Sequence, residues 1–247
     1  MLRSETSATG EAREWLAQAR SIAVLTGAGI SAESGVPTFR GPGGLWRNFR
    51  PEELATPHAF ARDPKLVWEW YDWRRGIVAR AEPNAGHRAL VELERRAADF
   101  RLVTQNVDGL HDRAGSRRVI KLHGDIWMVR CTRCGAEERN VEVPLAQLPP
   151  ACRCGGLLRP GVVWFGEALP EQALAEALEA ARSCETFLVL GTSAVVYPAA
   201  AIPRVARENG ARVIEINVEP TELSALADVS LRGRTGELLP QLVTEAE

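Results

Sequence analysis

The stretch SIAVLTGAGISA, residues 21–32, decides the fold of this 247-residue chain. Its first half, Ser21–Thr26, is a short apolar run that stops at a glycine, which is typical of a buried β-strand. Gly27–Ala32 then matches the pattern G-x-G-x-x-G/A directly after that strand. Glycines there allow a tight turn and a close approach of the backbone to a pyrophosphate. One match of this kind is a weak signal, because a glycine turn can open a helix in any α/β protein.

Further strand patterns follow along the chain and alternate with helical ones. We expect helices at Glu11–Arg20, from a cap at Asn84 to about Ala98, at Glu171–Arg182 and at Pro198–Glu208. We expect strands at Arg101–Thr104, Val119–Leu122, Thr186–Leu190 and Arg212–Asn217. Alternating strands and helices imply right-handed crossovers. The sequence therefore predicts an α/β protein with a Rossmann-like parallel sheet and helices on both faces.

Two segments interrupt this alternation. Residues 46–82 contain a helical, aromatic stretch at Pro51–Ala81, and residues 127–159 carry prolines and cysteines without a long periodic helix. We expect residues 1–45, 83–126 and 160–247 to form the nucleotide-binding domain. The helical insertion and the cysteine-rich insertion then form a smaller domain together.

The composition excludes several classes of protein. The formal net charge is −2, whereas a dedicated nucleic-acid binder usually has a strong basic excess. No apolar run reaches the roughly 20 residues that a membrane helix needs, and the first ten residues carry no targeting pattern. Five cysteines, four of them clustered, fit a metal site in a reducing compartment better than a disulfide framework. We expect a cytoplasmic monomer.

Four cysteines form two close pairs, Cys131 with Cys134 and Cys152 with Cys154, separated by 17 residues. Such pairs are typical of a four-thiolate zinc ribbon, and four thiolates leave no ligand position for water, so the zinc would be structural. The second pair is C-x-C rather than the commoner C-x-x-C. A redox dithiol and a set of buried thiols are the alternatives. Cys184 precedes a strand and is expected to be a packed core thiol.

Polar residues follow the strands that end near Thr104 and Leu122. Gln105, Asn106 and Asp108 offer amide and carboxylate groups to a ribose or a nicotinamide amide, although Asp108 could instead form an Asx-turn. His123 sits in a turn at the carboxyl edge of the sheet, and its ordinary pKa near 6.5 suits a general base. The residues alone leave both a catalytic and a packing role open for it.

The acidic ribose ligand of an ordinary dehydrogenase is missing, because Glu52 and Glu53 do not end a strand. Asn217 and Glu219 do lie at the end of a strand, where ligands of open α/β sheets gather. A dinucleotide site in this chain therefore differs from that of a dehydrogenase.

The glycine loop continues as GAGISAESGVPTFRG, residues 27–41, and this stretch resembles the signature of the sirtuin family. Five further motifs follow in the order of that family and extend the resemblance over nearly the whole chain. They are TQNVDGLH (104–111), KLHGD (121–125), GVVWFGE (161–167), GTSAVVYP (191–198) and INVEP (216–220).

The resemblance implies an NAD-dependent protein-lysine deacylase. It implies that the acyl carbonyl oxygen attacks C1′ of the nicotinamide ribose and that His123, with Asn106 and Asp108, carries the catalysis. The products would be nicotinamide, lysine and O-acyl-ADP-ribose. Val163, Trp164 and Phe165 would bind the substrate peptide as an added strand, opposite residues 194–197. The NAD contacts that it implies are Gly27, Ala28, Gly29, Ile30, Ser31, Glu33, Thr38, Phe39, Arg40, Trp46, Gln105, Asn106, Val107, Asp108, His123, Gly191, Thr192, Ser193, Asn217, Val218, Glu219 and Thr235.

Tyr71 and Arg74 lie three residues apart on the predicted aromatic helix and therefore share a face. The residues alone favour an aromatic core helix from which Arg74 reaches water. The pattern Tyr-x-x-Arg also resembles the class III sirtuins, which implies a pocket for succinyl or malonyl groups beside acetyl.

Two other functions use the same features. A mono-ADP-ribosyltransferase would need the same NAD site, and a non-catalytic NAD-responsive binding module could use the zinc ribbon to hold a partner. The presence of His123, Asn106 and Asp108 together speaks against the binding module.

Overall fold

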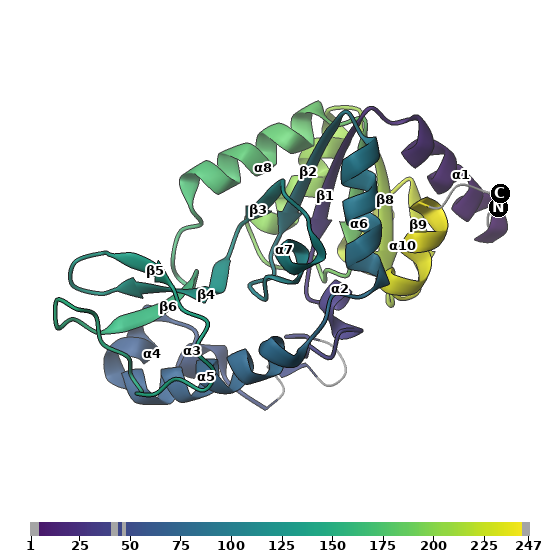
Figure 1. The fold of residues 1–247 in the computed structure, drawn as a ribbon. Helices are drawn as coiled ribbons and strands as arrows, with labels where there is room; N and C mark the ends of the chain where they lie inside the picture. Colours follow the sequence, from purple (N-terminus) through teal and green to yellow (C-terminus); the bar gives the residue numbers. More distant parts are fainter. Residues whose placement is uncertain (1–4, 41–43, 46–47, 244–247) are drawn as a thin grey trace.

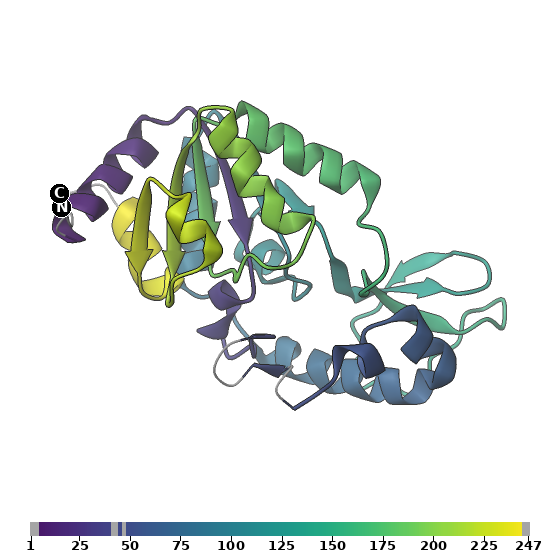
Figure 2. The same ribbon diagram turned by 180° about the vertical axis from the view of Figure 1, so that it is seen from behind.

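The computed structural model describes residues 5–40, 44–45 and 48–243. Trp46, which the sequence places among the NAD contacts, lies outside these residues. The chain forms a large part around a six-stranded sheet and a smaller part of helices with a three-stranded sheet (Figures 1 and 2).

The large sheet is wholly parallel and has the strand order β3-β2-β1-β7-β8-β9. Its strands are β1 (Ser21–Thr26), β2 (Asp99–Thr104), β3 (Val119–Lys121), β7 (Thr186–Leu190), β8 (Arg212–Asn217) and β9 (Val229–Arg232). The chain leaves β1 toward β2 on one side, whereas β7 leads to β8 on the other side. The strand order therefore reverses between β1 and β7, and ligands of open α/β sheets bind outside the carboxyl ends at such a point.

Helices cover both faces of this sheet, which confirms the predicted fold class. Alternate residues of each strand point to opposite faces, so that Val24 and Leu102 pack with one set of helices and Leu25 and Val103 with the other. The first set is α1 (Glu5–Gln18), α2 (Gly29–Ala32), α6 (Ala85–Arg96) and α10 (Thr235–Val243). The second set includes α8 (Glu171–Ser183) and α9 (Ile202–Glu208). The short helix α7 (Leu110–Ala114) follows β2.

The smaller part contains three helices where the sequence predicts one continuous helical stretch over 51–81. They are α3 (Pro51–Leu54), α4 (Pro57–Arg62) and α5 (Pro64–Arg80). Thr56 and Asp63 cap the second and third helices by accepting hydrogen bonds from the N–H groups of Ala59 and Leu66. Each proline sits at the start of a helix, where its missing N–H costs nothing, and so it separates two helices instead of kinking one.

A three-stranded antiparallel sheet packs against these helices. Its strands, in the order β5-β4-β6, are β5 (Glu137–Arg139), β4 (Gly124–Cys131) and β6 (Leu158–Val162). Strand β5 lies within the cysteine-rich segment 127–159, and β4 and β6 overlap its two ends. The sequence predicts no strands for this segment. Trp68 of α5 is fully buried, and its indole N–H donates to the carbonyl oxygen of Leu158 at 2.8 Å. This contact joins the helices to the sheet.

Within the described residues, none of the helices combines the length and the apolar character that a membrane crossing requires.

Candidate active site

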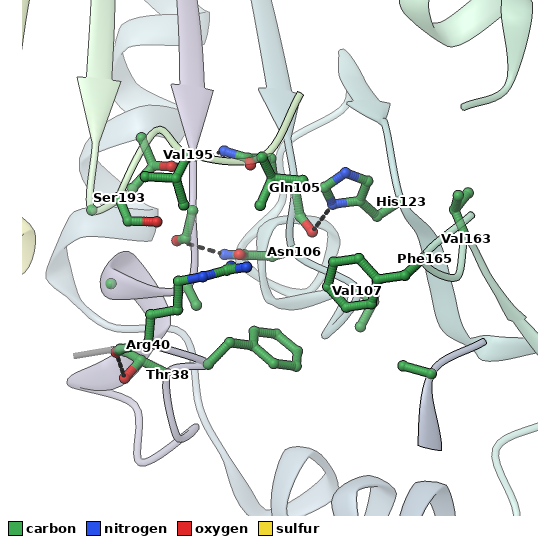
Figure 3. A pocket seen from close by; sticks show the side chains of 18 of the residues that line it. Thr38, Arg40, Gln105, Asn106, Val107, His123, Val163, Phe165, Ser193 and Val195 are labelled. Carbon is green, nitrogen blue, oxygen red and sulfur yellow. Dashed lines mark hydrogen bonds between the residues drawn. The ribbon is translucent and has the colours of Figure 1, made fainter. Parts of the chain in front are cut away.

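A cavity of about 780 Å³ lies between the two parts of the molecule. Figure 3 shows its wall: the loops after β1, β2 and β7 on one side, and Val163 and Phe165 on the other. The switch point of the sheet thus opens into the space beside the smaller part.

The glycine loop after β1 touches the loop after β7. The N–H of Gly29 donates to the carbonyl oxygen of Gly191 at 2.8 Å, and the N–H of Gly27 donates to that of Leu190 at 3.0 Å. A Cβ on Gly29 would lie 2.7 Å from Gly191 backbone atoms, so a side chain there would push the loops apart. This close approach leaves the backbone of both loops lining the cavity.

A second cavity of about 410 Å³ continues from the first. The two share Gly29, Thr38, Gly191, Asn217 and Val218. The second one extends to Glu33 and to the residues that follow β9, including Arg234 and Thr235. Together the two spaces give one continuous site along the carboxyl edge of the sheet.

A buried carboxylate holds the loop after β8, which lines both cavities. Glu215 of β8 is 1% exposed and accepts hydrogen bonds from the hydroxyls of Thr221, Ser224 and Ser230. The guanidinium of Arg232 donates to the same carboxylate at 3.0 Å. These hydrogen bonds outweigh burial and lower the pKa of Glu215, so that a fixed negative charge holds the loop to β9.

The loop after β2 is hydrogen-bonded to the glycine loop after β1 and to the loop after β7. The side-chain amide of Asn106 donates to the carbonyl oxygen of Gly27 at 3.0 Å, and that of Gln105 donates to the hydroxyl of Thr192 at 3.0 Å. With its N–H₂ group turned to the glycine loop, Asn106 has its carbonyl oxygen available as an acceptor (Figure 3).

Asp108 lies under the site instead of lining it. Its carboxylate accepts from the hydroxyl of Ser31 at 2.8 Å and from the N–H of Leu110 at 2.8 Å. The second bond is the Asx-turn that the sequence leaves open. Burial raises the pKa of Asp108. The geometry therefore favours a positioning role, in which Asp108 ties the loop after β2 to α2.

His123 presents one ring nitrogen to the cavity. Its Nδ1 lies 3.0 Å from the carbonyl oxygen of Gln105, which can only accept, so Nδ1 carries the hydrogen and Nε2 carries the free lone pair (Figure 3). Burial lowers the pKa of His123, while the hydrogen bond to Gln105 opposes this shift. The ring is therefore neutral and basic at Nε2 near pH 7.

Tyr71 and Arg74 of α5 line the cavity from the smaller part. Both are buried, with 3% and 6% exposure. The Arg74 guanidinium lies over the rings of Phe39 and Trp70, at 4.5 and 5.0 Å from their centroids. Burial lowers its pKa, and the negative charge of Asp108 opposes the shift. The sequence alone favours a guanidinium that reaches water, whereas the structure buries it at the wall of the cavity.

Most of the predicted site residues come together. All five predicted substrate contacts, Tyr71, Arg74, Val163, Trp164 and Phe165, line the first cavity. So do sixteen of the predicted NAD contacts: Gly27, Ala28, Gly29, Thr38, Phe39, Arg40, Gln105, Asn106, Val107, His123, Gly191, Thr192, Ser193, Asn217, Val218 and Glu219. Glu33 and Thr235 line the second cavity, whereas Ile30, Ser31 and Asp108 line neither.

The structure adds residues that the sequence did not single out. Gly233 and Arg234 line the second cavity because they follow β9, a strand that the sequence analysis did not predict. Trp70 lines the first cavity beside Arg74. Its neighbours on the same aromatic helix were the available signal, but the sequence could not tell which aromatic side chains face the core.

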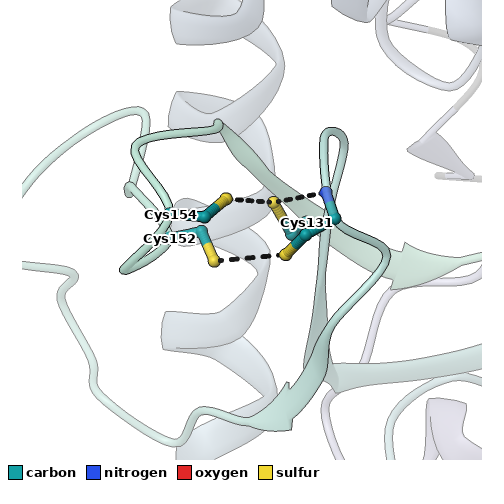
Figure 4. Close-up of side chains that lie close together, drawn as sticks. Cys131, Cys152 and Cys154 are labelled. Atoms are coloured by element: carbon teal, nitrogen blue, oxygen red, sulfur yellow. Dashed lines mark hydrogen bonds between the residues drawn. The ribbon is translucent and has the colours of Figure 1, made fainter.

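The four clustered cysteines bring their sulfur atoms together at one end of the small sheet. All four sulfurs lie within 4.8 Å of one another, with Cys131 and Cys154 at 3.5 Å and Cys134 and Cys152 at 3.8 Å (Figure 4). Tetrahedral zinc with bonds of about 2.3 Å to sulfur needs sulfurs roughly 3.8 Å apart. The four thiolates are positioned to bind one zinc ion, and the C-x-C spacing of the second pair does not prevent this.

Comparison with known proteins decides the family. The Sir2 family model matches residues 27–198 of this chain. An NAD-dependent protein deacylase from Pyrobaculum aerophilum is 59% identical over 233 residues, which cover 94% of this chain and 93% of that protein.

This chain belongs to the Sir2 family.

Other Sir2 relatives agree with this assignment. The NAD-dependent protein deacylase of Pyrococcus furiosus is 54% identical and covers 96% of this chain and 97% of its own. A solved Sir2 homologue in complex with ADP-ribose has a TM-score of 0.92 and 50% identity, with 94% of each chain covered. A Sir2 protein bound to a myristoylated histone peptide has a TM-score of 0.81 and 40% identity, covering 96% and 95%. The sirtuin resemblance of the sequence is confirmed.

The cysteine cluster gives a first prediction. Freshly purified protein should contain one zinc per chain, and Cys131→Ser should lower the thermal stability of the protein, because metal binding and folding are coupled. Metal analysis and a thermal melt measure both effects. Cys184→Ser, which changes the buried thiol outside the cluster, should keep its zinc. Protein without stoichiometric zinc would contradict the assignment.

The network around Glu215 gives a second prediction. Glu215→Gln removes the charge that holds the loop after β8, so the KM for NAD should rise about tenfold while the KM for the acyl peptide changes little. Steady-state kinetics with each substrate varied in turn measure the split. Glu208→Gln, a change at an exposed carboxylate of α9, is the matched control. Equal rises in both KM values would show a general structural defect.

Proposed function

We propose that this chain is an NAD-dependent protein-lysine deacylase. The observation that carries the proposal is the position of His123, whose free Nε2 faces a cavity that joins the glycine loop to the buried Tyr71–Arg74 end. A nucleotide at the loop and an acyl chain at the far end would meet beside this histidine. The relatives that are named NAD-dependent protein deacylases support the same reaction.

NAD, acyl-lysine and water give nicotinamide, lysine and O-acyl-ADP-ribose, with the acyl group transferred from the lysine nitrogen to a ribose hydroxyl. The hydroxyl must lose a proton to attack, and Nε2 of His123 is the neutral acceptor on that side of the cavity. Asn106 offers its side-chain oxygen to hold a ribose hydroxyl, and Phe39 covers the reacting face and excludes water.

The peptide chain of the substrate has a place between residues 161–166 and 194–197. Phe165 and Tyr197 are 41% and 70% exposed at the mouth of the cavity. The N–H of Val163 already donates to the carbonyl oxygen of His123 at 2.9 Å. An added strand would pair with the main chain of these two segments, and such pairing demands little of the flanking side chains.

We further propose that the acyl pocket prefers succinyl and malonyl groups over acetyl. A carboxylate that leaves water for an apolar pocket needs a fixed cation and hydrogen bonds. Arg74 supplies the cation: its guanidinium lies over aromatic rings and forms no ion pair within the described residues, although the charge of Asp108 acts on it. Tyr71 lies one turn away on the same helix and supplies a hydroxyl. Acetyl-lysine fits the same space and remains a substrate.

We propose that the substrates are acylated proteins of the cytoplasm and that the enzyme acts as a monomer without nucleic acid. The nearly balanced charge of −2 and the four clustered cysteines, which suit a metal site in a reducing compartment, support this setting.

The proposal predicts that His123→Ala abolishes deacylation and leaves NAD binding measurable. Loss of the ring removes the proton acceptor, whereas the glycine loop and the loop after β8 stay in place. Single-turnover assays on an acetylated peptide and calorimetric titration with NAD test the two parts. Near-normal turnover in a folded variant would show that another group is the base.

The pH dependence tests the same residue in the unchanged protein. The pKa of free histidine is near 6.5, and burial lowers the pKa of His123. The neutral form of His123 therefore persists to a lower pH than the neutral form of free histidine. The acid limb of kcat/KM should therefore fall below pH 6.5, since activity is lost only as the ring gains a proton. An acid limb well above that value would contradict His123 as the base.

The acidic-acyl proposal predicts the effect of Arg74→Met. Loss of one partner of a buried charged pair costs about 2–5 kcal/mol, which corresponds to a loss of about 30-fold to 5,000-fold in kcat/KM for succinyl-lysine. The loss for acetyl-lysine should be far smaller, because that group carries no charge. Arg74→Lys keeps the charge without the planar fork, so its kcat/KM for succinyl-lysine should lie between that of the unchanged protein and that of Arg74→Met. Equal losses on both substrates would make Arg74 structural.

A further inference from the structure

The hydroxyl of Tyr71 is not free to orient itself. The indole Nε1 of Trp164 lies 2.9 Å from the Tyr71 oxygen, and both side chains are 3% exposed. An indole N–H can only donate. The tyrosine oxygen therefore accepts from Trp164, and its own hydrogen must point elsewhere. Since Tyr71 lines the cavity beside Arg74, that hydrogen is available to a group in the acyl pocket.

Three contacts fix Trp164 in turn. Its backbone N–H donates to the carboxylate of Glu167 at 2.8 Å. The guanidinium of Arg159 lies 3.6 Å from the centroid of its ring, and the ring of Phe60 packs at 5.3 Å from it. The indole thus has a fixed plane as well as a fixed position.

Arg159 and Glu167 form a bidentate ion pair, with nitrogen-to-oxygen distances of 2.5 and 2.8 Å. Arg159 also donates to the carbonyl oxygen of Val162 at 3.0 Å. It is 7% exposed and is not among the residues that line the cavity, so it does not touch an acyl group there. Its contacts named here reach Glu167, Trp164 and the carboxyl end of β6, after which these two residues follow.

The protonation of Tyr71 agrees with a donor role. Burial raises the pKa of Tyr71 to about 12, although the positive charges of Arg74 and Arg159 oppose the shift. The phenol therefore keeps its hydrogen throughout the neutral range.

Resting on the acidic-acyl pocket proposed above, we propose that Glu167, Arg159 and Trp164 are positioning residues that make Tyr71 a hydrogen-bond donor toward the acyl group. Tyr71 and Arg74 then both present donors to the end of the acyl chain. A terminal carboxylate accepts from both. A terminal methyl group accepts from neither, and a terminal carboxamide brings donors of its own toward Arg74. Selectivity for acidic acyl groups thus depends in part on residues that act through Tyr71.

A double-mutant cycle separates this role from simple packing. The variants are Trp164→Phe, Tyr71→Phe and the two combined, where phenylalanine keeps an aromatic ring against Arg159 and Phe60 but loses the indole N–H. The readout is the ratio of kcat/KM for succinyl-lysine to that for acetyl-lysine in one peptide sequence. This ratio cancels any effect of Trp164 on the peptide backbone, which is common to both substrates.

We expect Trp164→Phe to lower the ratio about tenfold, as for the loss of one oriented hydrogen bond to a charged group. In the Tyr71→Phe background the same change should lower it no further, since no hydroxyl is left to orient. An unchanged ratio in Trp164→Phe, or additive losses in the double variant, would overturn the proposal. Arg159→Lys, which keeps the charge and loses the bidentate fork, should also lower the ratio, and should lower it no further in the Tyr71→Phe background. This variant tests the proposal if Trp164→Phe does not fold.

Arg74→Met distinguishes the failure of this inference from the failure of the pocket. If Arg74→Met collapses the ratio and Trp164→Phe leaves it unchanged, the pocket is acidic-selective and the positioning role is wrong. If the unchanged protein prefers acetyl-lysine and Arg74→Met leaves the ratio as it was, the acidic-acyl pocket falls and the positioning role falls with it.

Discussion

The contact between Gly29 and Gly191 is the constraint on which the site depends. Backbone meets backbone at the switch point of the sheet, with a hydrogen bond of 2.8 Å and no space for a Cβ. Asn106 and Gln105 then attach the loop after β2 to the glycine loop and to Thr192. The carbonyl oxygen of Gln105 in turn fixes the ring of His123. The position of His123 therefore depends on the contact between Gly29 and Gly191, because the loops that carry these residues are bonded to one another.

The smaller part buries several polar side chains, and burial is costly unless each charge or donor has a partner. Arg159 meets Glu167 across a bidentate pair, and Trp164 gives its indole N–H to Tyr71. Arg74 differs from these groups, because aromatic rings flank its guanidinium and the charge of Asp108 acts on it without an ion pair within the described residues. A buried cation in that setting gains most from a substrate that carries the opposite charge. The proposed acyl preference follows from this electrostatic demand.

Local patterns predict the strands β1, β7 and β8 to the residue, because each has a buried, mainly apolar centre and ends at a turn. Strand β9 and the helix after it went unpredicted, since Val229–Arg232 is short and mixes apolar with polar residues. The aromatic pattern runs through Pro57 and Pro64, so it does not predict the breaks between helices at these prolines. Motif resemblance placed most cavity residues, yet no local pattern shows that Asp108 turns toward Ser31, or that Trp164 reaches Tyr71, 93 residues away.

Product analysis tests the central claim most directly. One peptide carrying acetyl-, succinyl- or malonyl-lysine is incubated with the enzyme and NAD, and every product is followed by mass spectrometry. The account predicts nicotinamide, deacylated peptide and O-acyl-ADP-ribose in equal amounts, with the acyl group of the peptide found on the ribose. Nicotinamide release with ADP-ribose attached to protein, and with no loss of the acyl group, would contradict it and identify a mono-ADP-ribosyltransferase instead.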